Sequence, residues 1–122
     1  MVHRSIYGLL LIAMIVASAV TLVAHMKASK MEPTANSTVT APPTRIQVWF
    51  TQAPDPKVSK LELAGPAGPV KLTGFQVTAA KSIVASVDGT LADGRYTARW
   101  QSAGDDGHVQ KGEYGFTVKR AN

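Results

Sequence analysis

Two histidines and one aspartate carry the donor atoms from which this sequence could build a metal site. Asp106 and His108 stand in the segment GDDGHVQKG, residues 104–112, and are separated only by Gly107. In a strand, residues i and i+2 point to the same face, and a glycine between them lets the backbone turn. One carboxylate and one imidazole form only half of a site, so the remaining donors must come from elsewhere in the chain.

His25 is the candidate for the other half. The chain begins MVHRS, continues with IYGLLLIAMIVASAVTLVA, and has no charged residue from Ser5 to Ala24. A short positive head, an apolar run and small residues at its end are typical of a secretory signal peptide, so we predict a signal helix over residues 1–24 and cleavage after Ala24. His25 then becomes the first residue, and its free amine and ring nitrogen can chelate one ion.

Two alternatives to this processing stay open. Ala17-Ser18-Ala19 is a better small-x-small cleavage signal, and a cut there would leave VTLVAH at the front of the chain. The 19 residues from Ile6 to Ala24 are also close to the ~20 apolar residues that span a bilayer, so the segment could remain as an uncleaved membrane anchor. Either alternative keeps two imidazoles and a carboxylate but removes the amine donor.

The donor types indicate which metal the site would hold. Nitrogen-rich coordination completed by one oxygen favours Cu(II), by ligand type and by the Irving–Williams order. The chain contains no cysteine, which excludes disulfides, cysteine-type zinc sites, iron–sulfur clusters, thiolate catalysis and a blue-copper centre.

Charge and the remaining polar residues exclude two other classes of function. The net charge of +5 is spread along the chain without a basic run or interleaved aromatics, so we expect no nucleic-acid binding. The acidic and hydroxyl side chains show no arrangement of a nucleophile with a base, and both histidines beyond residue 24 are already used. We therefore expect no enzyme.

The elements that must position the donors show two-residue periodicity. No helical period appears past residue 25, and apolar residues alternate in short runs separated by turn signals. The predicted strands cover residues 45–51, 58–63, 70–72, 75–77, 83–87, 95–100 and 114–118. This pattern predicts an all-β fold over residues 25–122, an immunoglobulin-like Greek-key β-sandwich or barrel of about seven strands.

Two further features refine that fold. The segment ASKMEPTANSTVTAPPT, residues 28–44, is rich in small polar residues, and its Pro42-Pro43 pair suits an extended lead into the first strand. Leu91, Gly94 and Tyr96 resemble a tyrosine corner, in which a tyrosine hydroxyl pins a loop of a Greek-key sandwich.

Taken together, these residues resemble the CopC family of periplasmic copper-binding proteins. The resemblance runs from His25 to Val118 and is carried by SKMEPTANSTVTAPPTRIQVWF, LADGRYTARWQSAGDDGH and GEYGFTV, in that order. It implies a seven-stranded Greek-key barrel or sandwich, and Cu(II) bound by an N-terminal histidine brace from His25 with Asp106 and His108. It also implies a Cu(II) carrier or buffer in periplasmic copper homeostasis or resistance. The partner it implies is a CopD-type inner-membrane copper transport protein, and we expect a monomer.

The chain departs from the family pattern at three places. SAGDDGH carries one residue more than the commonest Ser-x-Asp-Gly-His, so Asp105 competes with Asp106; we assign Asp106 because it keeps the two-residue spacing to His108. Val109 follows the motif histidine where the family usually has proline. Gln52 stands where the family often has glutamate near the amine, and it can hydrogen-bond there but supplies no charge.

The chain offers few methionines from which a Cu(I) site could be built. Met26 and Met31 are the only methionines after residue 24, and we expect them to pack against the sandwich rather than to form a Cu(I) site.

The alternative function is a structural or adhesive immunoglobulin-like exported module without a metal, in which Asp106 and His108 are turn residues. His25 at the processing site favours the metal-binding hypothesis, because an adhesive module has no reason to place a histidine there.

Overall fold

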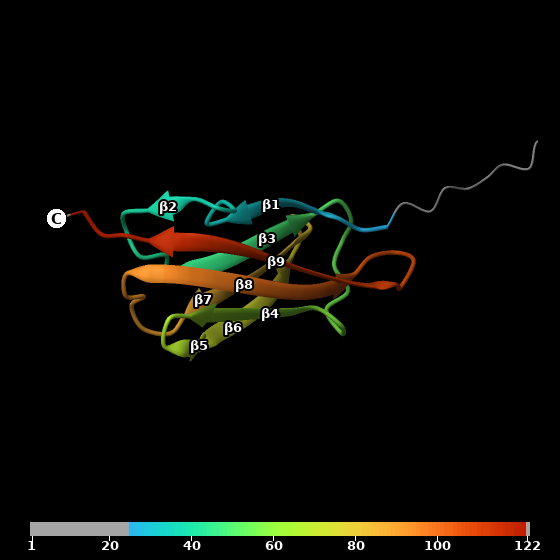
Figure 1. The fold of residues 1–122 in the computed structure, drawn as a ribbon. Helices are drawn as coiled ribbons and strands as arrows, with labels where there is room; N and C mark the ends of the chain where they lie inside the picture. The colour runs from blue at the N-terminus through green and yellow to red at the C-terminus, as the bar shows by residue number, and fades with distance from the viewer. Residues whose placement is uncertain (1–24, 122) are drawn as a thin grey trace, which may run out of the picture.

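The structure is a computed structural model that describes residues 25–121, and these residues form nine strands in two facing sheets (Figure 1). The strands are β1 (Ala28–Glu32), β2 (Thr38–Val39), β3 (Arg45–Phe50), β4 (Lys60–Gly65), β5 (Gly68–Val70), β6 (Leu72–Thr78), β7 (Ser82–Val87), β8 (Gly94–Ala103) and β9 (Val109–Val118). One sheet has the order β1-β3-β7-β6 and the other β2-β9-β8-β4-β5. The predicted all-β sandwich is confirmed, and the signal helix predicted over residues 1–24 lies outside the described residues.

Strand β3 brings the beginning of the described chain to one end of the sandwich. It pairs antiparallel with β7 on one side and with β1 on the other, and the β1 register places Ala28 opposite Phe50. Because β1 runs against β3, the residues just before β1 lie beside the end of β3.

The long hairpin of β8 and β9 brings a second segment to the same end. Its register runs from Gly94 opposite Val118 to Ala103 opposite Val109, so the loop over residues 104–108 closes the hairpin. In Figure 1 this loop and the start of the described chain lie at the same end of the molecule. Residues from the two ends of the sequence therefore meet there.

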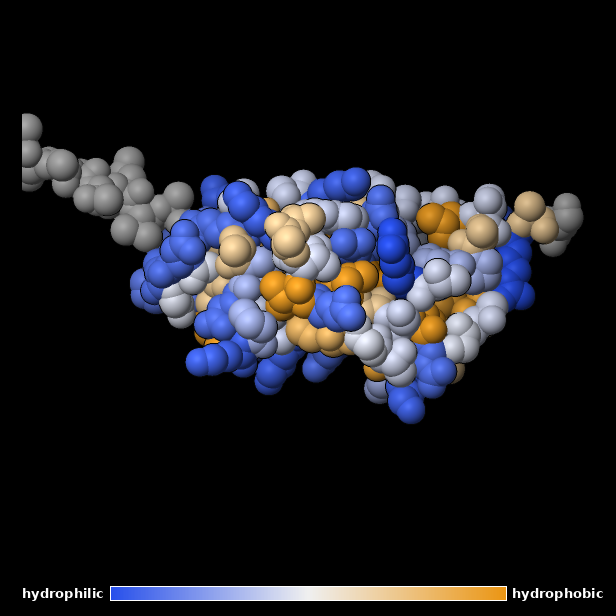
Figure 2. Space-filling model, turned by 180° about the vertical axis from the view of Figure 1, so that it is seen from behind, coloured by the Kyte–Doolittle hydropathy of each residue, from blue (hydrophilic) through white to orange (hydrophobic). Residues whose placement is uncertain are grey.

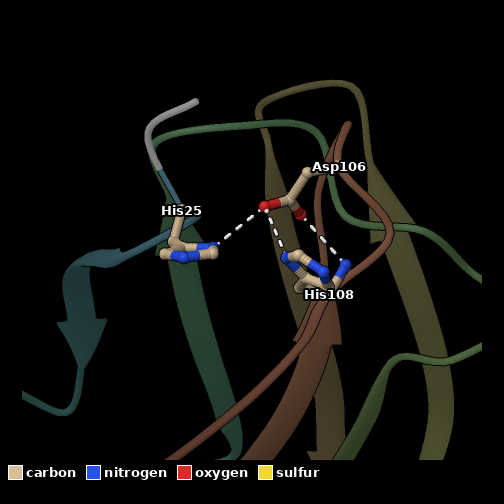
Figure 3. A group of neighbouring side chains, drawn as sticks. All are labelled: His25, Asp106 and His108. Atoms are coloured by element: carbon tan, nitrogen blue, oxygen red, sulfur yellow. Dashed lines mark hydrogen bonds and ion pairs between the residues drawn. The ribbon is translucent and has the colours of Figure 1, made fainter. Parts of the chain in front are cut away.

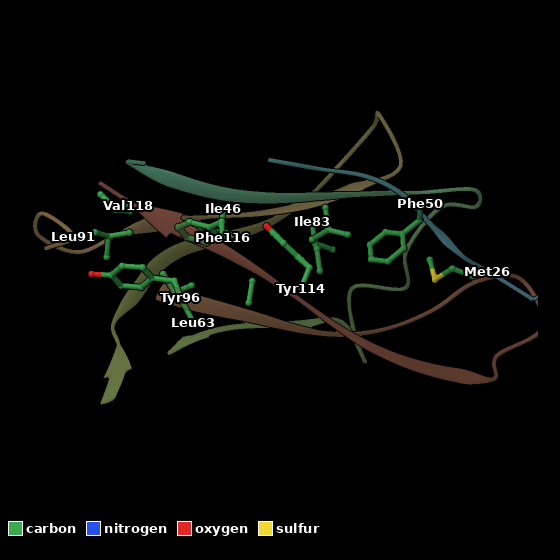
Figure 4. Packing of buried hydrophobic residues seen from close by; sticks show 12 residues of the cluster. Met26, Ile46, Phe50, Leu63, Ile83, Leu91, Tyr96, Tyr114, Phe116 and Val118 are labelled. Atoms are coloured by element: carbon green, nitrogen blue, oxygen red, sulfur yellow. The ribbon is translucent and has the colours of Figure 1, made fainter. Parts of the chain in front are cut away.

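Alternating side chains of β3, β8 and β9 fill the space between the sheets (Figure 4). The rings of Tyr96 and Phe116 stack with their centroids 5.5 Å apart, and Phe116 is completely buried. Burying one such side chain contributes about 1.5–3 kcal/mol, so a core of this size can hold a domain that has no disulfide. The buried cluster consists of Met26, Ile46, Val48, Phe50, Leu63, Ile83, Leu91, Tyr96, Ala98, Tyr114, Phe116 and Val118.

The predicted tyrosine corner is present. The Tyr96 hydroxyl donates a hydrogen bond of 2.7 Å to the carbonyl oxygen of Ala92, and Leu91 beside it is buried in the core. This bond ties the segment before β8 to the strand itself.

The structure differs from the sequence-based expectation mainly in the polar segment before β3. That segment was expected to be only extended, but it forms β1 and the short β2, which pairs parallel with β9 through Thr38 opposite Thr117. Met26 is buried in the core and Met31 packs against it, so both methionines have packing roles, as expected.

The surface carries small apolar groups among polar ones. Figure 2, which shows the face seen from behind, has orange groups in its middle that are interrupted by blue and white side chains. Phe75 and Val109 are the large apolar side chains that are exposed within residues 25–121. Over the same residues, no helix is long and apolar enough to cross a membrane.

We expect Tyr96→Phe to lower the free energy of unfolding by about 1 kcal/mol, because a hydrogen bond contributes about 0.5–1.5 kcal/mol net. For a domain of this size the melting temperature should fall by about 4–8 °C per kcal/mol. Urea and thermal denaturation of the metal-free protein measure this change. Tyr114→Phe is the matched control, because its hydroxyl lies 3.4 Å from the carbonyl oxygen of Glu32, at the limit of a hydrogen bond. A larger loss in Tyr114→Phe than in Tyr96→Phe would contradict the role of the corner.

Candidate metal centre

The three predicted donor residues meet at one end of the sandwich (Figure 3). His25 lies three residues before β1, whereas Asp106 and His108 lie in the loop between β8 and β9. The pairing of β1 with β3 and the register of the β8–β9 hairpin together bring them close. The structure thus places side by side the residues that the sequence could only suggest as two separate halves.

Asp106 lies at the centre of this cluster. Its Oδ2 atom is 2.9 Å from Nδ1 of His25 and 3.2 Å from Nδ1 of His108. The two imidazole rings are inclined by 49°, with their centroids 5.4 Å apart. One donor atom from each of the three residues lies within 4.8 Å of the other two. An ion with bonds of about 2.0–2.2 Å would therefore need only small shifts of these side chains.

The local sequence explains how Asp106 reaches this place. The carbonyl oxygen of Gly104 accepts a hydrogen bond from the Gly107 amide at 3.1 Å, which closes a turn. Oδ1 of Asp106 accepts a bond of 3.0 Å from the His108 amide, the Asx-type contact that aspartate favours in turns. Gly107 has a φ of 72°, a left-handed conformation that suits glycine. One carboxylate oxygen therefore shapes the loop while the other faces both imidazoles.

The donors differ strongly in exposure. The side chain of Asp106 is only 10% exposed, whereas those of His25 and His108 are 55% and 70% exposed. The carboxylate thus forms the base of the cluster and the two rings form its open side. An ion, or a ligand from another molecule, can approach the rings directly from solvent.

Hydrogen bonds hold Asp106 in its charged form. The amide of His108 is the main cause that lowers the pKa of this carboxyl below its ordinary value. The hydrogen bond from His25 and the charges of both histidines act in the same direction, and desolvation opposes them. Asp106 is therefore ionised at neutral pH, the state that metal coordination needs.

Asp105 and Gln52 take different places from those of the cluster. The side chain of Asp105 is exposed, and its backbone amide donates a 2.9 Å hydrogen bond to Oε1 of Gln52. The sequence suggested Gln52 as a hydrogen-bonding residue near the amine, and the structure adds this contact with the 104–108 loop. Thr51, which the sequence did not single out, accepts a bond from the Lys27 amide at 3.0 Å. No local pattern could identify these contacts, because they join residues 53 and 24 positions apart.

Among residues 25–121, the cluster lies at the surface at one end of the sandwich, with both imidazole rings exposed. A shallow groove of about 450 Å³ runs along β4, β8 and β9 among charged side chains such as Lys60, Glu62 and Arg99. None of the three donor residues lines it. Within residues 25–121, the arrangement is suited to holding an ion at the surface.

A small β-sandwich that gathers two imidazoles and a carboxylate at one end has the features of a metal-binding protein of the all-β class. Known proteins of this class include relatives of this chain. The chain belongs to the CopC family, whose domain model matches residues 28–119, and the resemblance inferred from the sequence is thereby confirmed.

Individual relatives agree with this assignment. Protein YobA of Escherichia coli K12 is 30% identical over 102 residues, which cover 79% of this chain and 80% of YobA. The structure of PcoC, a methionine-rich copper resistance protein from Escherichia coli, matches with a TM-score of 0.71 and 32% identity, over 79% of this chain and 100% of PcoC. CopC from Methylosinus trichosporium OB3b matches with a TM-score of 0.70 and 25% identity, over 80% of this chain and 97% of that one.

We expect the Asp106 carboxyl of the metal-free protein to titrate below its ordinary value of 3.8. Because the pKa is depressed in the folded state, the stabilisation it brings is present above the unfolded pKa and is lost as the pH falls through the folded pKa. A ¹³C NMR titration of this carboxyl carbon measures the midpoint. His25→Ala should raise the midpoint, because it removes one of the hydrogen bonds. A midpoint at or above 3.8 in the unchanged protein would refute this account of the cluster.

Proposed function

We propose that this protein is an exported Cu(II)-binding protein that carries or buffers copper in copper homeostasis or resistance. The observation that carries the proposal is the 2.9 Å approach of His25 Nδ1 to Asp106 Oδ2 across 81 positions of sequence. His108 adds a second imidazole from the same loop as Asp106. Two imidazoles and an ionised carboxylate that converge from opposite ends of the chain are donors that favour Cu(II).

The N-terminal amine is the fourth donor of the proposed site. In this proposal residues 1–24 are a signal peptide and residues 25–122 are the CopC-like copper-binding domain. Cleavage before His25 would free an amine next to the ring nitrogen of the same residue, and the two form the histidine brace. With His108 and Asp106 this makes three nitrogens and one oxygen, a set that suits the tetragonal geometry of Cu(II).

The relatives support copper as the metal. PcoC is described as a copper resistance protein, and this chain is 32% identical to it over the whole length of PcoC. The donor atoms of the cluster agree with copper, because two imidazole nitrogens and one ionised carboxylate oxygen are ligands that favour Cu(II).

The exposure of the donors supports a carrier rather than an enzyme. More than half of each imidazole side chain is exposed, at 55% and 70%, so a ligand of another protein can reach the ion and replace one donor at a time. We propose that copper is the cargo of a periplasmic monomer and passes to a CopD-type inner-membrane copper transport protein. The alternative, an adhesive module without a metal, gives no reason for an ionised carboxylate to lie between two imidazoles.

We expect His108→Ala and Asp106→Asn to weaken Cu(II) binding by more than about 100-fold, because loss of even an outer partner of a ligand costs about 10–100-fold. Competition titration against a chromophoric chelator at neutral pH measures the affinity. Asp105→Asn is the matched control and should bind as the unchanged protein does. Unchanged affinity in His108→Ala would reject the site, and a loss in Asp105→Asn equal to that in Asp106→Asn would reject the choice of aspartate.

We expect intact-mass analysis of the exported protein to show a mature chain that begins at His25. One residue added before His25 should then lower Cu(II) affinity, because the amine becomes part of a peptide bond and no longer binds the ion. The same residue added after Asn122 is the control and should have no effect. A mature chain that begins at Val20, or equal affinities for the two extended proteins, would reject the amine as a donor.

A further inference from the structure

Thr51 and Gln52, the two residues that directly follow β3, each contact one half of the donor cluster. Thr51 contacts the segment that carries His25, and Gln52 contacts the loop that carries Asp106 and His108. We call these two residues the Thr51-Gln52 pair. Neither is a candidate metal ligand, and the tyrosine corner and the core do not explain their contacts.

The Thr51 contact fixes the chain just after His25. The Thr51 hydroxyl accepts a hydrogen bond of 3.0 Å from the Lys27 amide, and the Thr51 amide donates one of 2.9 Å to the Lys27 carbonyl oxygen. Residues 25–27 precede β1, so these bonds extend the order of the sheet toward His25. Met26, buried against the core, secures the same stretch on its other side.

The Gln52 contact fixes the loop just before Asp106. Its side-chain oxygen accepts the Asp105 amide at 2.9 Å. The same side chain lies against Gly104, so closely that a Cβ atom at position 104 would overlap the Gln52 amide group. Gly104 and Asp105 begin the turn in which Asp106 binds the His108 amide. The position of this turn therefore depends on the end of β3.

We infer that the Thr51-Gln52 pair sets the separation between His25 and the Asp106–His108 loop and thereby determines how tightly the site binds its ion. The inference rests on the proposed Cu(II) site. A chelate whose arms are ordered by folding binds more tightly than one whose arms must be ordered by the metal, because the ordering entropy is lost before binding. Both residues are positioning residues that act through the backbone of the segments they hold.

Gln52→Ala tests the loop half of the pair. We expect Cu(II) affinity to fall by about tenfold, the lower range for loss of an outer partner of a metal ligand. In the metal-free protein, amide hydrogen exchange at Asp105 should become about fivefold faster, because its acceptor is gone. Gln52→Glu keeps an acceptor oxygen of the same reach and should restore slow exchange. Gln76→Ala, a matched change at an exposed position on β6, should alter neither quantity.

Thr51→Val tests the other half, because valine has the shape of threonine but cannot accept the Lys27 amide. Cu(II) affinity should again fall by about tenfold. Because the lost hydrogen bond is exposed, the melting temperature of the metal-free protein should fall by less than in Tyr96→Phe.

A double-mutant cycle tests the close contact of Gln52 with Gly104. Gly104→Ala alone should weaken binding, because the new methyl group displaces the Gln52 side chain. In the Gln52→Ala background the same methyl group meets a much smaller side chain. The double variant should therefore lose clearly less Cu(II) binding free energy than the sum of the losses in the two single variants. Fully additive losses would overturn the proposed contact.

The outcomes separate this inference from the proposed function. If His108→Ala abolishes Cu(II) binding but Gln52→Ala and Thr51→Val bind as Gln76→Ala does, the positioning role is overturned and the site stands. If His108→Ala has no effect on Cu(II) binding, the proposed function fails. Unchanged exchange at Asp105 in metal-free Gln52→Ala would overturn the positioning role without reference to copper.

Discussion

The edge-to-face contact between Phe50 of β3 and Trp100 of β8 joins the two sheets near the end where the donor residues meet. Their ring centroids are 5.0 Å apart and their planes are inclined by 72°. Phe50 ends β3, and Trp100 stands in β8 shortly before the loop that carries Asp106 and His108. The indole lies over Gly112 of β9, where any side chain would overlap it. Aromatic pairs of this geometry contribute about 0.5–1.5 kcal/mol beyond burial. Phe50 directly precedes the Thr51-Gln52 pair, so the pair that we propose to position the donor cluster begins at an ordered core contact.

The three residues of the cluster consist of one nearly buried carboxylate and two exposed imidazoles. Asp106 is nearly buried, and both of its oxygens are engaged, one with the His108 amide and the other with the imidazoles. The two rings are more than half exposed to solvent, and each contacts the Asp106 carboxylate through its Nδ1 atom. A fully enclosed set of donors would hold an ion more permanently, whereas exposed rings can exchange one bond at a time. This division of exposure among the three residues is compatible with the release of copper that the proposed carrier function requires.

The sequence predicted the architecture better than the contacts that adjust the site. Alternation in the segments of β3, β8 and β9 predicted the sandwich, and Leu91, Gly94 and Tyr96 predicted the corner, because each signal is local. Strands β1 and β2 escaped prediction because their polar residues carry no alternation and their pairing partners are distant in sequence. The close placement of His25, Asp106 and His108 was expected, although their binding of a metal remains a prediction. The contacts of Thr51 and Gln52 could not be foreseen, because hydrogen bonds between loops leave no periodic pattern.

The position of His25 makes the proposed site dependent on export as well as on folding. Its imidazole is brought to Asp106 by the pairing of β1 with β3, which needs only the folded domain. Under the proposed function, its amine would become a donor only after the preceding peptide bond is cut. A folded but unprocessed chain would therefore present two imidazoles and a carboxylate, and the processed chain would present a fourth donor on an already ordered scaffold. The amine nitrogen and the ring nitrogen that contacts Asp106 both belong to His25. Binding of the ion by the amine therefore requires little further ordering of the chain. Under the proposed function, strong copper binding would begin only after cleavage before His25.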